Sequence, residues 1–192
     1  MRHGQTDANR DGLLLGRADV PLNDTGRAQA ATVAGSFDAA PAVVVTSPLH
    51  RCVDTAKVIA DRWGVGVRVD DRLVEIDYGA WDETALGEVP DEAWAHWRKD
   101  PSFAPPGGES LTAVHARVEE CARELLEGSQ DGIVVAVSHV SPIKAAAAWA
   151  LGGGPEISWR LRLDVGSVSR ITRGPAGAIL LTWNEVPRPG SR

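Results

Sequence analysis

Two short runs of β-branched residues constrain the fold more than any other feature of this sequence. They are AVVVTS at residues 42–47 and IVVAVS at residues 133–138. Continuous apolar runs of this length are typical of strands covered on both faces, as in a parallel sheet. A helical pattern follows each run. We therefore expect an α/β fold: a three-layer α/β/α sandwich with a mainly parallel central sheet and helices on both faces.

The remaining elements follow from periodicity, turn residues and capping signals. Helices are expected at 22–37, 49–63, 86–99 (broken by Pro90), 110–128 and 142–154, with Ser110 as an N-cap and Pro142 in a first helical turn. Further strands are expected at 67–73, 160–164, 167–173 and 178–186, with GPAG joining the last two as a hairpin. Such sheets bind ligands beyond the carboxyl ends of their strands, so functional residues are expected there.

Composition narrows the class of protein. A chain of 192 residues is long enough for one domain with a real core, and its net charge of −6 argues against nucleic acid as a partner. Cys52 and Cys121 lie far apart in helical contexts without metal-ligand spacing, which indicates reduced, buried thiols and a cytoplasmic protein. No apolar run reaches the length that spans a membrane, so no membrane partner is expected.

Charged residues gather at the predicted strand ends. Arg51 follows the first apolar run, His139 follows the second, and Glu75 comes after the strand expected at 67–73. If Arg2 and His3 end a further strand, one edge of the sheet holds two arginines, two histidines and a glutamate. This set fits phosphoryl transfer, in which a neutral imidazole attacks phosphorus, guanidinium groups neutralise charge and an acid protonates the leaving oxygen. The arginine and histidine side chains can supply the positive charge that a metal ion would provide, so no cofactor is expected.

Six segments of the chain carry a family resemblance. They are RHGQTDAN, GRADVPLNDTGRAQA, TSPLHRCVDTA, LVEIDYGAWD, PPGGES and SHVSPIK. In this order and spacing they resemble the histidine phosphatases, also called the phosphoglycerate-mutase-like superfamily, and look most similar to its α-ribazole phosphatase-like branch. The resemblance implies that His3 is the nucleophile and Glu75 the proton donor. It also implies a phosphate pocket formed by Arg2, Arg51 and His139.

The resemblance extends to residues around this pocket. It adds to the substrate- and phosphate-binding set Asn9, Gly16, Glu109, Ser110 and Val140. Gly16 matches a loop that closes over phosphate, and Ser110 would also cap its helix.

Three assignments stay open. Asp77 is a second candidate for the proton donor, although Glu75 is favoured. Trp81, Trp94 and Trp97 could belong to the core or line a cap over the pocket. Lys144 could meet an anionic substrate, although a solvated helix face is the favoured interpretation.

Two segments depart from the family pattern. Only Met1 precedes Arg2, whereas the family usually has several apolar residues there, which form a central strand. We therefore expect one histidine-phosphatase domain at 1–186 whose first strand is truncated, leaving neighbouring strands unpaired and a void in the core. A reading frame that begins further upstream, or fusion to an upstream domain, would explain this start. The second departure is WDETA, where WEGLT is usual, and residues 187–192 are expected to form a disordered tail.

The expected function is hydrolysis of a small phosphate monoester through a phosphohistidine on His3. The resemblance suggests α-ribazole 5′-phosphate, a compound of cobalamin assembly, or a sugar phosphate as the substrate. The alternatives are a phosphoglycerate-mutase-type phosphotransferase and a weakly active anion-binding domain. Mutases carry long insertions for which this chain has no room, so the phosphatase is favoured. A homodimer is left open.

Overall fold

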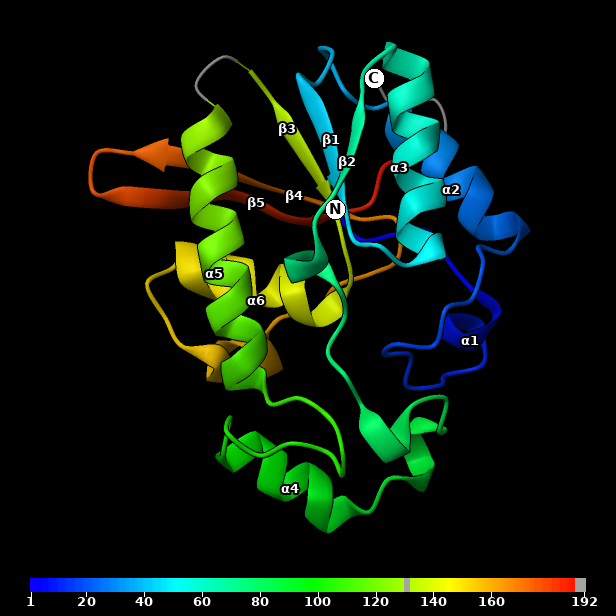
Figure 1. Cartoon of the computed structure of the whole chain (residues 1–192), viewed down its shortest axis with the longest axis vertical. Helices are drawn as coiled ribbons and strands as arrows, with labels where there is room; N and C mark the ends of the chain where they lie inside the picture. The colour runs from blue at the N-terminus through cyan, green and yellow to red at the C-terminus, as the bar shows by residue number, and fades with distance from the viewer. Residues whose placement is uncertain (130–131, 189–192) are drawn as a thin grey trace.

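The structure of the chain, a computed structural model, describes residues 1–129 and 132–188 and confirms the α/β fold (Figure 1). Its strands are β1 (Val43–Thr46), β2 (Val67–Val69), β3 (Val134–Val137), β4 (Val168–Gly174) and β5 (Gly177–Glu185). Its helices are α1 (Asp7–Arg10), α2 (Asp24–Ala34), α3 (His50–Trp63), α4 (Asp91–Lys99), α5 (Leu111–Gly128) and α6 (Val140–Ala150). Short 3₁₀ turns are η1 (Asp71–Leu73), η2 (Gly79–Trp81), η3 (Leu86–Glu88) and η5 (Pro155–Arg160). Residues 189–192 of the expected tail lie outside the described residues.

The central sheet is parallel, with the order β2-β1-β3. Both apolar runs form strands, as predicted, and the two strands pair with each other. Residues 1–3 lie along the other edge of β3, where Arg2 forms a parallel bridge with Ser138. On the side of this segment that faces away from β3, the Arg2 N–H donates to the carbonyl of Ser167, just before β4 (3.0 Å). β4 and β5 form an antiparallel hairpin, also as predicted.

Helices cover the sheet on both faces, which gives the predicted three layers (Figure 1). On one face α2 and α3 bury Val33 and Ile59 against the strands. On the other face α5 buries Cys121 against Val45 of β1. A third apolar cluster joins α4, α5, α6 and η5 at the end of the molecule that carries α4.

The tryptophans of residues 81–97 belong to this third cluster. Trp97 is 2% exposed and stacks on Trp94 with the ring centroids 5.7 Å apart. Trp81 lies 6.0 Å from Trp97, and Trp159 of η5 closes the cluster 5.6 Å from the same ring. Each tryptophan packs against other aromatic rings, as expected for core residues.

Two predicted strands are corrected. The strand expected at 67–73 ends at Val69, because Asp70 accepts a hydrogen bond from the Arg72 N–H and caps η1. The strand expected at 160–164 is wrong. Residue 160 ends η5, and the carbonyls of Arg162 and Leu163 accept side-chain N–H groups, from Trp183 and from Arg2, instead of strand partners.

Two expectations drawn from composition can be compared with the structure. Cys52 and Cys121 are free and buried in helices, as predicted. Among the described residues no helix is both long and apolar enough to cross a membrane.

Candidate active site

His3 lies where the segment beside β3 ends. It is 2% exposed, and its Nδ1 lies 2.7 Å from the carbonyl oxygen of Gly4. Because a carbonyl oxygen only accepts, Nδ1 carries the proton and the lone pair is on Nε2. Burial, together with the charges of Arg2 and Arg51, holds the pKa of His3 well below its usual value. His3 is therefore a neutral imidazole whose Nε2 can act as a nucleophile.

The glycine that follows His3 is required by close packing. A Cβ on Gly4 would lie 2.3 Å from the backbone oxygen of Gly26 in α2. The Gly4 N–H donates to Oγ1 of Thr55 in α3 (3.2 Å). Contacts with two helices thus fix the backbone from which the His3 side chain projects.

Two arginines flank His3, the buried Arg51 and the partly buried Arg2. Arg51 is fully buried in the first turn of α3, and its guanidinium donates to the carbonyls of Ala18 (2.7 Å) and Gly16 (2.8 Å). Within the part of the chain that the structure describes, Nε of Arg2 is buried without a hydrogen-bond partner. Burial lowers the pKa of both guanidinium groups. A buried donor on a cation favours the binding of an oxyanion.

His139 lies beside this pair. Its ring meets the His3 ring edge-on, with the centroids 5.1 Å apart. Nε of Arg51 donates to Nδ1 of His139 (3.2 Å), so the proton is on Nε2, which donates to Oγ of Ser47 (2.7 Å). Burial and the charge of Arg51 hold the pKa of His139 well below its usual value. The site thus combines two neutral imidazoles with two guanidinium cations.

The two neutral histidines give folding stability a defined pH dependence. Their pKa values are well below the usual 6.5 in the folded state and near it in the unfolded chain. Below about pH 6.5 the unfolded state therefore binds more protons. As the pH is lowered below about 6.5, the free energy of unfolding should therefore decrease by up to about 1.4 kcal/mol per pH unit for each histidine.

Urea unfolding between pH 6.5 and pH 5 measures this slope. We expect a shallower slope in the His3→Gln/His139→Gln double variant than in the wild-type chain. His96→Gln is the control, because the His96 side chain is 58% exposed, and it should leave the slope unchanged. Equal slopes in the wild type and the double variant would contradict burial of neutral imidazoles.

Glu75 lies under the first turn of α6. It is 3% exposed, and its two oxygens accept the N–H groups of Val140 and Ser141 (3.0 Å each). These bonds cap α6 in place of its own N-cap residue, so the helix begins at Val140, two residues before the predicted start. The negative charge of Glu75 opposes the effect of burial on the pKa of Arg2 and of Arg51. The charge of this carboxylate therefore acts on both cations of the site.

Asp77, the second candidate acid, has the contacts of a turn residue. Its Oδ1 accepts the N–H of Gly79 (2.8 Å), and its carbonyl accepts the N–H of Glu109 (2.8 Å). Of the two carboxylates, Glu75 is the one that interacts electrostatically with the arginines of the site. Glu75 therefore stays the favoured candidate for the proton donor.

The loop at residues 16–18 is held by Asp82. Oδ1 of Asp82 accepts the Gly16 N–H (2.6 Å), and Oδ2 accepts the N–H groups of Arg17 and Ala18 (2.8 Å each). Two carbonyls of the same loop accept the guanidinium of Arg51. A Cβ on Gly16 would lie 2.8 Å from a neighbouring backbone oxygen, so the position requires glycine. One carboxylate thus fixes the loop that was predicted to close over phosphate.

Asp82→Asn should weaken the binding of phosphate. The amide nitrogen of asparagine cannot accept, so the loop loses charge-assisted hydrogen bonds worth about 1.5–3 kcal/mol each when intact. We expect the inhibition constant of inorganic phosphate to rise roughly 10-fold or more in a p-nitrophenyl phosphate assay. Asp11→Asn, on the exposed surface, is the matched control. An unchanged constant in Asp82→Asn would show that the loop does not shape the anion site.

Glu109 and Ser110 have partners of their own. Oγ of Ser110 accepts the N–H of Ala113 (3.1 Å), which confirms the predicted N-cap of α5. Glu109 accepts from Nε of Arg117 (2.8 Å) and lies 3.4 Å from Nη2 of Arg17. Glu109 therefore connects the 16–18 loop to α5, and Arg17 remains half-exposed beside it.

The other predicted residues lie in two helices, α1 and α6. Asn9 forms a capping box with Thr6, whose Oγ1 accepts the Asn9 N–H (3.2 Å). Val140 contributes its N–H to Glu75. Lys144 is half-buried one turn further along α6, where burial lowers its pKa, so its side chain is only partly solvated.

Three residues of this region were missed. Asp82 stands at the second position of WDETA, and Ser47 stands directly after β1 in TSPLHR, so both had a signal in motifs already recognised. Arg117, which binds Glu109 and the carbonyl of Arg72, reads from sequence as an ordinary charged position on a helix.

Comparison with known proteins places the chain in a family. Residues 1–186 match the profile of the histidine phosphatase superfamily (branch 1). The chain is 38% identical over 174 residues to the bifunctional protein Rv2228c of Mycobacterium tuberculosis, a match that covers 88% of this chain and 48% of that protein. The chain thus spans about half the length of the curated relatives it matches first.

Two phosphatases match over most of their own length. Glucosyl-3-phosphoglycerate phosphatase of M. tuberculosis is 35% identical over 181 residues, covering 83% of this chain and 81% of that protein. The structure of mycobacterial glucosyl-3-phosphoglycerate phosphatase complexed with VO3 superposes with a TM-score of 0.86 at 32% identity, over 95% of this chain and 96% of that one. Adenosylcobalamin/alpha-ribazole phosphatase of Escherichia coli is 31% identical over 193 residues, covering 96% and 93%. With a family profile that spans nearly its whole length, the chain belongs to branch 1 of the histidine phosphatase superfamily.

Proposed function

We propose that this protein is a phosphomonoesterase that forms a phosphohistidine on Nε2 of His3. One observation carries the proposal: a buried neutral imidazole, with its proton fixed on Nδ1, lies among two guanidinium groups and a second neutral histidine. Such a set can bind a phosphate dianion and attack it. Membership in a phosphatase family supports the same reaction.

The proposed reaction has two steps. The Nε2 lone pair of His3 attacks phosphorus, the bond from phosphorus to the ester oxygen breaks, and Glu75, in its protonated form, gives that oxygen a proton and becomes a carboxylate. Water then attacks phosphorus, Glu75 takes a proton from the water, and the phosphorus–nitrogen bond breaks to release phosphate. Arg2, Arg51 and His139 hold the phosphoryl oxygens throughout, and the loop at 16–18 encloses them.

The residues around the pocket favour a substrate with a second anionic group. Within the described residues the Lys144 ammonium has no ion-pair partner, and it lies one helical turn beyond the N–H groups that bind Glu75. Arg17 adds a half-exposed cation on the phosphate loop. We therefore place a phosphate ester that also bears a carboxylate, of the phosphoglycerate type, ahead of α-ribazole 5′-phosphate and simple sugar phosphates.

A substrate panel tests this order. We expect kcat/KM for glucosyl-3-phosphoglycerate to exceed those for α-ribazole 5′-phosphate and glucose 6-phosphate by 10-fold or more, and Lys144→Met to remove most of the difference. A preference for α-ribazole 5′-phosphate would support the cobalamin branch instead. Return of the phosphoryl group to a phosphoglycerate would identify the protein as a mutase. Binding of phosphate without turnover would identify it as an anion-binding domain.

The reaction is proposed to be independent of metal, because Arg2 and Arg51 supply the positive charge. EDTA should therefore leave turnover unchanged. Residues 1–186 are proposed as one catalytic domain. Fusion to a second domain is supported by the relative Rv2228c, which is bifunctional, and the free buried thiols support a cytoplasmic location.

A further inference from the structure

The segment that carries Glu75 is buried but has no regular structure. Residues 74–78 lie between η1 and η2 and form neither helix nor strand. Val74, Glu75 and Ile76 are each at most 6% exposed. Buried backbone N–H and C=O groups need hydrogen-bond partners, and a segment outside helices and sheets must find them on side chains or neighbouring loops. The position of the proposed proton donor therefore depends on groups elsewhere in the chain.

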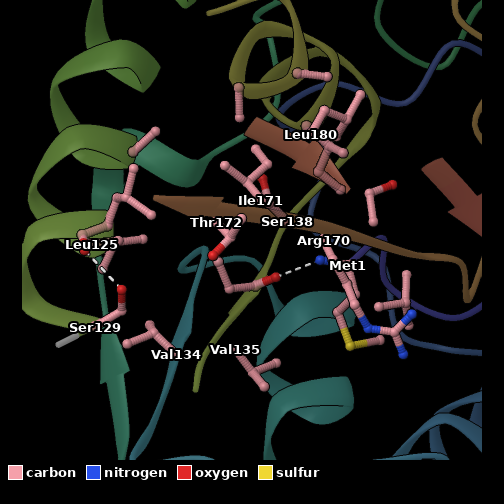
Figure 2. A pocket seen from close by; sticks show the side chains of 18 of the residues that line it. Met1, Leu125, Ser129, Val134, Val135, Ser138, Arg170, Ile171, Thr172 and Leu180 are labelled. Atoms are coloured by element: carbon pink, nitrogen blue, oxygen red, sulfur yellow. Dashed lines mark hydrogen bonds between the residues drawn. The ribbon is translucent and has the colours of Figure 1, made fainter. Parts of the chain in front are cut away.

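Ser138 and Arg117 bind the carbonyls at the start of this segment. Oγ of Ser138 donates to the carbonyl of Leu73 (2.6 Å). Both residues line an apolar pocket of about 430 Å³ between the sheet and α5, and Figure 2 shows Ser138 on its wall. Arg117 of α5 donates from Nη1 to the carbonyl of Arg72 (2.6 Å) and from Nη2 to the carbonyl of Glu75 (3.3 Å). One guanidinium thus holds the backbone of the proton donor and a carbonyl three residues before it.

Arg117 is itself held in place. It lies on α5 three residues after Val114 and four before Cys121, both buried, so it shares the buried face of the helix. Its Nε and Nη2 donate to the two oxygens of Glu109 (2.8 and 3.0 Å), and both side chains are only 18% exposed. Burial raises the pKa of Glu109, but the hydrogen bonds and charge of Arg117 hold it below its usual value. This two-bond ion pair fixes the orientation of the guanidinium that binds the carbonyls.

The carboxylate of Glu75 is held separately from its backbone. Its oxygens accept the N–H groups of Val140 and Ser141 in the first turn of α6. Arg117 of α5 thus sets the backbone of Glu75, whereas α6 sets its carboxylate. Proton transfer requires the carboxyl oxygen within hydrogen-bond distance of the leaving oxygen, and a displacement of about 1 Å can lower a rate by about 10²-fold. A shift of the Glu75 backbone is therefore expected to affect proton transfer first.

We propose that Arg117 is a positioning residue for the proton donor, which holds the backbone of Glu75 so that its carboxyl group reaches the leaving oxygen. This inference rests on the proposed function, in which Glu75 protonates that oxygen. Arg117 acts through Glu75 and not on the phosphoryl group. Its loss should therefore affect each ester according to how much the leaving oxygen needs a proton.

Arg117→Met tests this role, because methionine has no donor for either carbonyl. We expect kcat for an alkyl phosphate to fall roughly 10- to 100-fold, and kcat for p-nitrophenyl phosphate to fall less than about 3-fold. Loss of the bond to Glu109 acts on both esters alike, so the ratio of the two losses is the readout. Arg123→Met is the matched control, because Arg123 lies on the same helix, is 52% exposed and pairs with Glu119. It should leave both values of kcat unchanged.

A double variant shows whether Arg117 acts through Glu75. Adding Arg117→Met to Glu75→Gln should lower kcat for the alkyl phosphate by less than about 2-fold more, because the proton donor is already absent. A general effect of Arg117 on the site would lower kcat by the same factor with or without Glu75. If Tm shows that Arg117→Met does not stay folded, Arg117→Lys replaces it. Lysine keeps the charge beside Glu109 but has one nitrogen for three partners, so the same change in the ratio is expected.

Two results would overturn the inference. The first is an equal loss on the two esters in Arg117→Met, or in Arg117→Lys where that variant replaces it. The second is full additivity in the double variant. Failure of the proposed function has a different signature: hydrolysis that survives in His3→Ala, or a Glu75→Gln variant with Arg117 intact that slows both esters equally.

Discussion

His3→Ala is expected to lower kcat/KM for p-nitrophenyl phosphate by roughly 10³-fold or more. The substitution removes the only side-chain atom proposed to bond to phosphorus. Binding of phosphate should survive, because Arg2, Arg51 and His139 retain their contacts. Activity measured beside the inhibition constant of phosphate separates the two effects.

The covalent intermediate gives an independent readout. Wild-type chain quenched in alkali during turnover of a ³²P-labelled ester should carry an acid-labile, base-stable label, as a phosphohistidine does. His3→Ala should carry none, whereas His96→Ala, which alters an exposed histidine, should be labelled normally. Label retained in His3→Ala would place the nucleophile elsewhere.

The fold was predictable where local sequence and tertiary packing agree. The two apolar runs at 42–47 and 133–138 form β1 and β3. A strand buried on both faces appears in the sequence as a continuous apolar run, so each strand could be recognised from its own residues. Ser110 capped α5 through the next N–H groups of its own helix, so its signal was local. Both features depend on neighbours in sequence.

Predictions failed where a distant residue decides the local structure. α6 begins early because Glu75, 65 positions away, accepts the Val140 N–H, and nothing in the helix sequence reports that. Residues 160–164 look like a strand, but the carbonyls of Arg162 and Leu163 accept N–H groups from the side chains of Trp183 and Arg2. Propensity gives way to such tertiary hydrogen bonds.

For the site, sequence motifs located the groups at the three strand ends but not what orients them. Motif order was enough to bring His3, Arg51 and His139 together. The tautomers were not predictable, because they follow from the Gly4 carbonyl and from the Arg51 donor, which only the folded backbone positions. Asp82 was missed for the same reason: the three contacts that hold the loop are with backbone N–H groups 64 to 66 residues away.

Glu75→Gln is the prediction that tests the proton donor. A p-nitrophenolate leaving group needs little protonation, whereas an alkoxide needs a full proton transfer. Loss of the acid should therefore lower kcat for hydrolysis of an alkyl phosphate by roughly 10²- to 10⁴-fold. The kcat for p-nitrophenyl phosphate should fall much less. The glutamine oxygen can still accept from the first turn of α6, although its amide nitrogen cannot, so Tm must be measured beside kcat.

Asp77→Asn is the matched control, because Asp77 holds a turn and is the other carboxylate of the same segment. It should affect both esters equally and weakly. If Glu75→Gln instead slowed both esters by the same factor, Glu75 would act by capping α6 and positioning His139 rather than by moving a proton. The ratio of the two losses, and not their size, therefore distinguishes an acid from a helix cap.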